Sequence, residues 1–342
     1  MQWKFRLRAA SPDSEHRLPH VAHLSTSLPP AASADLSSPG RRFRDRRAEP
    51  RPERGTSLSH EADLPMAATL HRHWPEYGVE ALFLALFLLA AGMVSAWVHD
   101  PGVSWFPGSP DLPVRRVLAG AAMGLVVMAM VYSPWGRRSG THLNPAITLA
   151  YLRLGTIGRW DALFYLVAQV GAGLVSVALL RSGLLLPAAT PPAALSASLG
   201  PTTVWATFTT ELVLSASAML LILFTSNHRS WFRFTGALYA LLMMLIVACA
   251  APLSGFGMNL ARLLAVDVSG VGAAVGWLNL LPPLLGMQLG VAAWRLLTGR
   301  SQALCAKLAH NTHGRCIFRC RHPYQARAQA IRALGRRAGR RD

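Results

Sequence analysis

Six long apolar stretches alternate with polar connections along the central part of the chain. Their approximate limits are 78–98, 114–134, 160–181, 204–226, 233–252 and 272–297. Each has close to the roughly 20 residues that a helix needs to cross the hydrocarbon core of a bilayer. The pattern therefore predicts an all-α membrane protein with six transmembrane helices and with both chain termini on the same side.

Two connections contain apolar runs that are too short to cross a bilayer. One reads Ser-Gly-Thr-His-Leu-Asn-Pro-Ala from residue 139, and the other reads Ser-Gly-Phe-Gly-Met-Asn-Leu-Ala-Arg from residue 254. Asn is a preferred N-cap and Pro is favoured at the first helical position, so Asn144 and Asn259 each predict the start of a half-helix. One run begins inside and the other outside, which indicates an inverted repeat of about 77–200 and 201–298.

Each half also opens with one acidic residue inside an apolar helix, Glu80 in the first and Glu211 in the second. Ionisable side chains within membrane spans are costly and usually face the interior of the helix bundle. Their matching positions predict that the two carboxylates brace backbone groups of the two loops rather than transfer protons.

Together these motifs resemble the major intrinsic protein family, the aquaporins and glycerol facilitators. The first loop matches the family's first Asn-Pro-Ala loop, and the second matches its Asn-Pro-Ala-Arg loop with Leu in place of Pro; Gln169 also falls where the family has Gln. The residues that carry the two loop motifs are Asn144, Pro145, Ala146, Asn259, Leu260, Ala261 and Arg262. The resemblance covers about 77–298 and implies an aquaporin-like fold, passive transport without enzymatic activity or a required cofactor, and a homotetramer.

Two half-helices that enter from opposite faces would meet near the midplane with their positive N-terminal ends facing each other. Asn144 and Asn259 could then each donate a hydrogen bond into the lumen. A water held between them cannot relay protons along a continuous chain, and the opposed dipoles repel cations; this is the barrier for which aquaporins are the known example. The alternative is that the two Asn residues only cap helices.

The resemblance also implies the wall of the selectivity constriction. Arg262 corresponds to its arginine, Phe256 and Val247 to two further wall positions, and Gly124 or its neighbour Met123 to the fourth. An aromatic ring beside a guanidinium suits a polyol, so the expected solutes are water and small neutral molecules with glycerol leading. A strict water channel is the alternative, since the glycerol branch usually has Asp at the place of Leu263.

Charge is scarce and unevenly placed. Only 15% of the residues are charged against 52% hydrophobic, with a net charge of +18, whereas soluble proteins carry about 25% charge. Residues 1–76 read as a disordered basic extension, or as a gene-start artefact before Met66. The Arg bias of the loops predicts cytoplasmic termini in a multi-pass protein of the inner (plasma) membrane. Basic tails on an apolar body argue against a nucleic-acid partner.

Residues 299–342 form a cytoplasmic basic tail that concentrates metal-ligating residue types. Its candidates for a zinc-like ion are Cys305, His310, His313, Cys316 and Cys320. Their spacing resembles that of metal sites, and the reducing side of the membrane disfavours disulfides. The alternative is an unstructured tail with incidental thiols.

Two functions of other classes remain open. Inverted repeats with broken helices also occur in coupled secondary transporters, although these need a titratable or cation-binding group at the substrate site. In a membrane metal sensor, the Cys/His tail would be the working part.

Overall fold

The computed structural model describes residues 64–99, 112–184, 204–250, 257–268, 276–310 and 316–321. Six helices in these ranges are long and apolar enough to cross a membrane, and the described residues contain no strand. They are α1 (Met66–His99), α2 (Leu112–Tyr132), α5 (Arg159–Arg181), α6 (Val204–Ser226), α7 (Thr235–Leu245) with its π-helical continuation η2 (Ile246–Ala250), and α10 (Gly276–Thr298). The prediction of an all-α fold with six transmembrane helices is confirmed.

Two further helices, α4 (Pro145–Arg153) and α9 (Leu260–Val268), have nine residues each. At about 1.5 Å per residue each is roughly 14 Å long, which is under half of the about 30 Å of a hydrocarbon core. They are therefore the half-helices that the two loop motifs predict. The short helices α3 (Pro134–Ser139) and η1 (Phe232–Phe234) lie in the connections before α4 and before α7.

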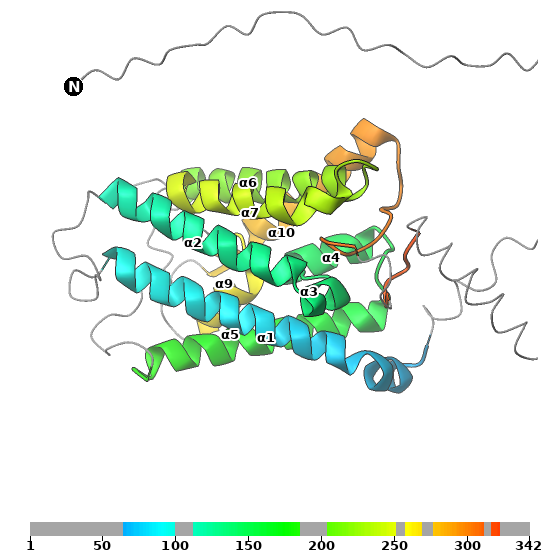
Figure 1. Ribbon diagram of the computed structural model, residues 1–342, viewed down its shortest axis with the longest axis horizontal. Helices are drawn as coiled ribbons and strands as arrows, with labels where there is room; N and C mark the ends of the chain where they lie inside the picture. Colours follow the sequence, from blue (N-terminus) through cyan, green and yellow to red (C-terminus); the bar gives the residue numbers. More distant parts are fainter. Residues whose placement is uncertain are drawn as a thin grey trace, which may run out of the picture. The chain divides into compact units, whose positions relative to one another are not determined.

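The long helices of the two halves pack in the same way. Helix α1 packs against α5 and α6 packs against α10, while α2 packs against α7 across the two halves (Figure 1). The third long helix of each half, α5 or α10, contacts both half-helices, since α4 and α9 each lie against α5 and α10. The half-helices are thereby held within the bundle of long helices.

Glycines allow the closest of these helix contacts. A Cβ atom on Gly286 of α10 would lie 2.4 Å from the carbonyl oxygen of Leu212 on α6, and one on Gly120 of α2 would lie 2.5 Å from that of Met244 on α7. Small residues of this kind let backbones approach closely where apolar lipid gives no hydrophobic drive for association.

Helix α1 begins at Met66 rather than near residue 78, so residues 66–76, expected within a disordered extension, are helical. Buried polar contacts explain the difference. His73 Nδ1 and the Tyr77 hydroxyl both bond Asp161 Oδ1 at the start of α5, at 2.7 and 2.6 Å. Nearby, Arg138 Nε donates to the buried Glu76 Oε1 at 2.8 Å. The sequence pattern missed these turns because their stabilising contacts are polar. Residues 1–63 of the expected extension lie outside the described residues.

The chain after α10 folds back over the bundle without regular secondary structure. Residues 299–310 and 316–321 lie at the end of the bundle that carries α3, α4 and the start of α1 (Figure 1). Ala306, Leu308 and Phe318 are buried there, as is the side chain of Lys307. These segments are packed against the membrane domain, unlike the unstructured tail that the sequence left as an alternative.

Candidate pore and the tail packed against it

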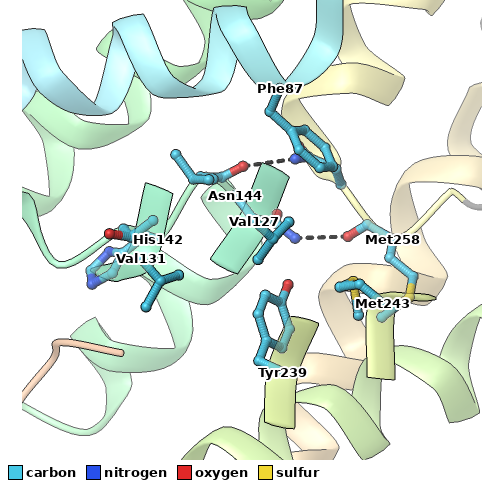
Figure 2. Close-up of a pocket in the computed structure, with 11 residues that line it drawn as sticks. Phe87, Val127, Val131, His142, Asn144, Tyr239, Met243 and Met258 are labelled. Atoms are coloured by element: carbon cyan, nitrogen blue, oxygen red, sulfur yellow. Dashed lines mark hydrogen bonds between the residues drawn. The ribbon is translucent and has the colours of Figure 1, made fainter. Parts of the chain in front are cut away.

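The two half-helices are joined at their N-termini by a reciprocal pair of hydrogen bonds. Asn144 Nδ2 donates to the carbonyl oxygen of Met258 at 2.8 Å, and Asn259 Nδ2 donates to that of Leu143 at 2.7 Å (Figure 2). Each Asn also caps its own half-helix, because Oδ1 accepts from the backbone N–H two residues later at 3.0 Å. Each amide nitrogen carries a second proton, which leaves one donor per Asn beyond the bond to the opposite loop.

The Leu at residue 260 gives the second loop a contact that a proline could not make. Its backbone N–H donates to Asn144 Oδ1 at 3.3 Å, whereas proline has no N–H. At the corresponding place in the first loop, Pro145 lacks this donor. The two loops are therefore joined by three hydrogen bonds, and the third is on one side only.

Both acids lie where they support the loops. The carboxylate of Glu80 accepts from the backbone N–H groups of His142 and Leu143, at 2.6 and 3.0 Å. Glu211 Oε1 accepts from Gly257 N at 2.7 Å. Both side chains are buried. Each accepts hydrogen bonds from backbone N–H groups that would otherwise be without acceptors in a non-helical segment within the membrane.

The first loop has a strained backbone. Gly140, Thr141 and Leu143 have φ values of 99°, 57° and 50°. Residues other than glycine rarely adopt this left-handed region, and each such residue costs roughly 1–3 kcal/mol unless its surroundings hold it in place. Glu80 provides part of that support, and the tail described below provides another part.

A cavity of about 30 Å³ lies beside the Asn pair. Since one water needs about 10–15 Å³ of such space, the cavity has room for a short file of waters. Its wall is mainly apolar, with polar groups concentrated at the loop (Figure 2). The lining residues are Phe87, Val127, Val131, Thr141, His142, Leu143, Asn144, Tyr239, Met243, Met258 and Asn259.

The expected constriction residues lie at different kinds of site. Arg262 is buried in the first turn of α9, and Val247 is half-buried in η2. Gly124 lies at the contact between α2 and α7, where an added Cβ would be 3.0 Å from Ala240 O. Phe256 lies outside the described residues. Met123 is buried in α2, and the assignment of these residues to one constriction stays a prediction.

His142 is a lining residue that the sequence analysis did not single out, although it lies inside the first loop motif. Its Nε2 bonds the carbonyl oxygen of Ala306 in the tail at 2.7 Å, and its Nδ1 faces Thr148 Oγ1 at 3.0 Å. Since a carbonyl oxygen only accepts, Nε2 carries the proton. The imidazole also stacks between the rings of Tyr151 and Phe318. Its position in the loop motif, two residues before Asn144, was the signal in the sequence that could have identified it.

Four of the five candidate metal ligands in the tail come together. The ligand atoms of Cys305, His310, Cys316 and Cys320 all lie within 4.8 Å of one another. His313 lies outside the described residues. Burial, together with hydrogen bonds to the other two thiols, raises the pKa of Cys305, whereas hydrogen bonds from Cys305 and Cys320 lower the pKa of Cys316. Closely packed thiols and an imidazole are the donor set that zinc prefers.

Six long membrane helices and two half-helices that meet at paired Asn caps define a channel-type membrane protein. The family model of the major intrinsic proteins matches residues 77–294, and the chain belongs to this family. Aquaporin NIP1-4 of Oryza sativa subsp. japonica is 31% identical over 225 residues, or 64% of this chain and 75% of that protein. Aquaporin Z of Bradyrhizobium diazoefficiens is 28% identical over 203 residues, or 56% of this chain and 83% of that protein.

Among solved structures, the aquaglyceroporin from Plasmodium falciparum has a TM-score of 0.52 and 16% identity, and the match covers 66% of this chain and 98% of that one. At this identity the likeness shows the fold alone. Membership of the family makes the protein a multi-pass membrane channel for water or small solutes, with no enzymatic activity and no cofactor needed for transport.

Proposed function

We propose that the chain is a passive channel for water and small neutral solutes, with glycerol leading, and that it excludes protons and ions. The observation that carries the proposal is the reciprocally bonded pair Asn144–Asn259 beside a narrow, mainly apolar cavity. Such a site leaves few polar partners for a passing solute, so desolvation is costly for an ion and modest for a water or a polyol. The second donor of each amide supplies the hydrogen bonds that a neutral solute needs.

Proton exclusion follows from the same pair. Both Asn side chains are fixed as donors, because each Oδ1 already accepts from its own half-helix. A water at this point must therefore turn its oxygen to both amides. The N-termini of α4 and α9 add positive partial charge at the same place, which opposes hydronium and metal cations alike.

The preference for glycerol rests on the constriction residues. The buried Arg262 provides donors for hydroxyl groups, while Phe256 and Val247 supply an apolar surface for the carbon edge of a polyol. A strict water channel is the alternative, and it would need a smaller or more polar opening. No carboxylate is among the described residues that line the cavity at the Asn pair, and both ring nitrogens of His142 already have partners in Thr148 and Ala306, which disfavours a cation-coupled transporter.

The test is the ratio of glycerol to water permeability, measured by light scattering in proteoliposomes with equal protein content. Val247→His adds bulk and a polar ring, so it should lower glycerol flux more than water flux. Phe256→Ala should widen the opening and admit larger polyols. An unchanged ratio in both variants would contradict the assignment of these residues to the filter, and wild-type vesicles impermeable to glycerol would favour the strict water channel.

We further propose a homotetramer in the inner (plasma) membrane, with both termini cytoplasmic. Large apolar side chains are exposed on several long helices, among them Leu125 on α2, Val167 on α5 and Val213 on α6. These faces can contact lipid or neighbouring subunits. Native mass spectrometry of the purified protein should give a mass four times that of the chain, and a monomer under conditions that preserve flux would contradict this part of the proposal.

The tail is proposed to hold one zinc-like ion at its Cys/His cluster. The proximity of four candidate ligand atoms supports this. Elemental analysis of protein purified without chelator should find about one ion per chain, as in a site of four protein ligands. Metal-free protein at full thiol content would exclude it. If channel flux were absent while metal was present, the metal-sensor interpretation would gain support instead.

A further inference from the structure

The geometry of the Cys/His cluster fits a closed metal site better than a disulfide. Cys305 Sγ and Cys316 Sγ are 3.6 Å apart and His310 Nε2 lies 3.0 Å from Cys320 Sγ. A disulfide needs a sulfur separation of about 2.05 Å. Zinc–sulfur bonds of about 2.3 Å in a tetrahedron place two sulfurs roughly 3.8 Å apart, close to the separation found here.

The four ligands lie on one stretch of the tail whose two ends are hydrogen-bonded to each other. Arg321 N donates to the carbonyl oxygen of Leu304 at 2.7 Å, so the chain returns to its starting point after crossing all four ligands. Leu304 N in turn donates to Asn227 Oδ1 at 2.6 Å, and Arg319 N donates to Thr156 O at 2.9 Å. The loop is thus fastened to the connections after α6 and after α4.

The same loop contacts the strained part of the first pore loop. Ala306 O accepts from His142 Nε2 at 2.7 Å, and Leu308 N donates to Gly140 O at 3.2 Å. The Phe318 ring stacks on the imidazole of His142 with centroids 5.5 Å apart and planes at 24°. The tail therefore positions a residue that lines the cavity next to Asn144.

We infer that Cys305, His310, Cys316 and Cys320 are the complete ligand set of a tetrahedral metal site, and that the bound ion clasps the tail against the first pore loop and fixes His142. The inference rests on the proposed metal binding and deepens it. Four ligands fill a structural zinc site without an open position, so His313 is not required and the ion has a structural role rather than a catalytic one.

Two physical arguments connect the ion to the pore. The described tail segments contain no helix or strand, and a segment this short rarely folds without a disulfide or a metal. The left-handed residues at 140–143 need outside support to persist. Releasing the tail removes a hydrogen-bond acceptor and a stacking partner from His142, so its ring in the cavity wall is held less firmly, by contacts such as those with Thr148 and Tyr151.

Charge near the cluster is consistent with thiolate ligands. Three thiolates and one divalent cation sum to one negative charge. Lys307, two residues after Cys305, is buried and brings one positive charge into the same part of the tail. Its ammonium also donates to the carbonyl oxygen of Arg137 at 2.8 Å, at the end of α3, so this lysine links the metal site to the helix that precedes the pore loop.

The experiment uses the purified full-length protein. Metal content, the absorption of a cobalt-substituted sample and water flux in proteoliposomes are measured for His310→Ala, His313→Ala and Phe318→Ala. Cys249→Ser is the matched thiol control, since Cys249 is exposed in η2 and lies apart from the cluster. We expect His310→Ala to lose the ion, and His313→Ala and Cys249→Ser to retain it with the cobalt spectrum of a sulfur-rich tetrahedral site.

Stripping the ion with chelator before reconstitution should lower water flux roughly threefold or more, the scale of losing one hydrogen bond, and added zinc should restore it. Phe318→Ala should keep the ion yet show the same fall. If metal is bound but flux does not depend on it, the ion does not hold the tail against the first pore loop, and only the proposal of metal binding stands. Loss of the ion in His313→Ala but not in His310→Ala overturns the ligand set. Metal-free protein with a Cys305–Cys316 disulfide overturns both.

Discussion

At the scale of single residues, the junction of the two half-helices shows how one substitution changes a symmetric site. The bonds of Asn144 to Met258 and of Asn259 to Leu143 are related by the repeat, at 2.8 and 2.7 Å. The bond from Leu260 N to Asn144 Oδ1 has no counterpart at Pro145, which lacks an N–H. The departure from Asn-Pro-Ala therefore adds a contact instead of leaving an unsatisfied donor.

That contact should contribute little to stability. Replacing Leu260 with Pro removes one hydrogen bond of 3.3 Å, worth about 0.5–1.5 kcal/mol at most, and places Pro where a helix favours it. We expect Leu260→Pro to keep its melting temperature within a few degrees and to retain water flux.

Asn259→Leu is the contrasting variant, because it leaves the Leu143 carbonyl and the first turn of α9 without their donor and their cap. It should unfold at a clearly lower temperature in thermal melts of the detergent-solubilised protein. Equal melting temperatures for the two variants would show that the reciprocal bonds do not hold the junction together.

Residue chemistry set the limits of sequence prediction at this site. The capping role of each Asn was readable, because a cap depends only on neighbours along the chain. The bonds to the opposite loop depend on the meeting of segments more than 100 residues apart, which no local pattern encodes. Gly124 illustrates the same limit, since periodicity could not tell whether it faced the lumen or α7.

At the scale of elements, α6 and α10 approach each other closely at Gly286. Gly286→Ala would place a Cβ 2.4 Å from a backbone oxygen, and a backbone cannot move aside as a flexible side chain can. We expect a loss of about 1–3 kcal/mol, typical of overpacking, seen as a lower melting temperature.

Gly78→Ala is the matched control for Gly286→Ala. It lies in α1 with no atom within 4 Å of the added carbon, and alanine favours a helix by roughly 0.5–1 kcal/mol over glycine. It should therefore leave stability unchanged or raise it. A similar loss for both variants would mean that the α6–α10 contact is looser than the structure has it.

The first turns of α1 give a second test at this scale. Asp161→Ala would leave the buried His73 and Tyr77 without their shared acceptor, at about 1–3 kcal/mol for each unsatisfied group. Asp161→Asn keeps an acceptor oxygen and should lose less. Limited proteolysis should cut the Ala variant before residue 78 sooner than the Asn variant, and identical digestion patterns would contradict a docked helix start.

These elements also show why the sequence predicted the helices better than their ends. Six apolar stretches are enough to identify six spans, because lipid selects for composition over about 20 residues. The start of α1 and the packing of the tail depend on polar contacts and on a Cys/His cluster that have no apolar periodicity. Spacing alone identified the cysteines as candidate metal ligands, but it could not show that His310 lies next to them in the structure.

At the scale of the whole molecule, the tail, α3, α4 and the start of α1 gather at one end of the bundle. Arginines accumulate there as well: Arg153 donates to Gln288, Arg295 to the Arg153 carbonyl and Arg300 to that of Asn227. Loops rich in Lys and Arg remain on the cytoplasmic side, so this end should face the cytoplasm.

The orientation can be tested with reporter fusions placed in the connections between spans. Fusions at Pro110 and Ala194 should report the outside, because their loops follow the first and third spans, and a fusion at His228 should report the inside. The expectation joins two independent arguments: the arginine bias sets the side of the first span, and six spans with two half-helices set the alternation.

If all three reporters appeared on the opposite sides, only the charge argument would fail. An Ala194 fusion on the same side as His228 would instead remove α6 as a span between them, and with it the opposed entry of α4 and α9 on which the proposed proton barrier depends.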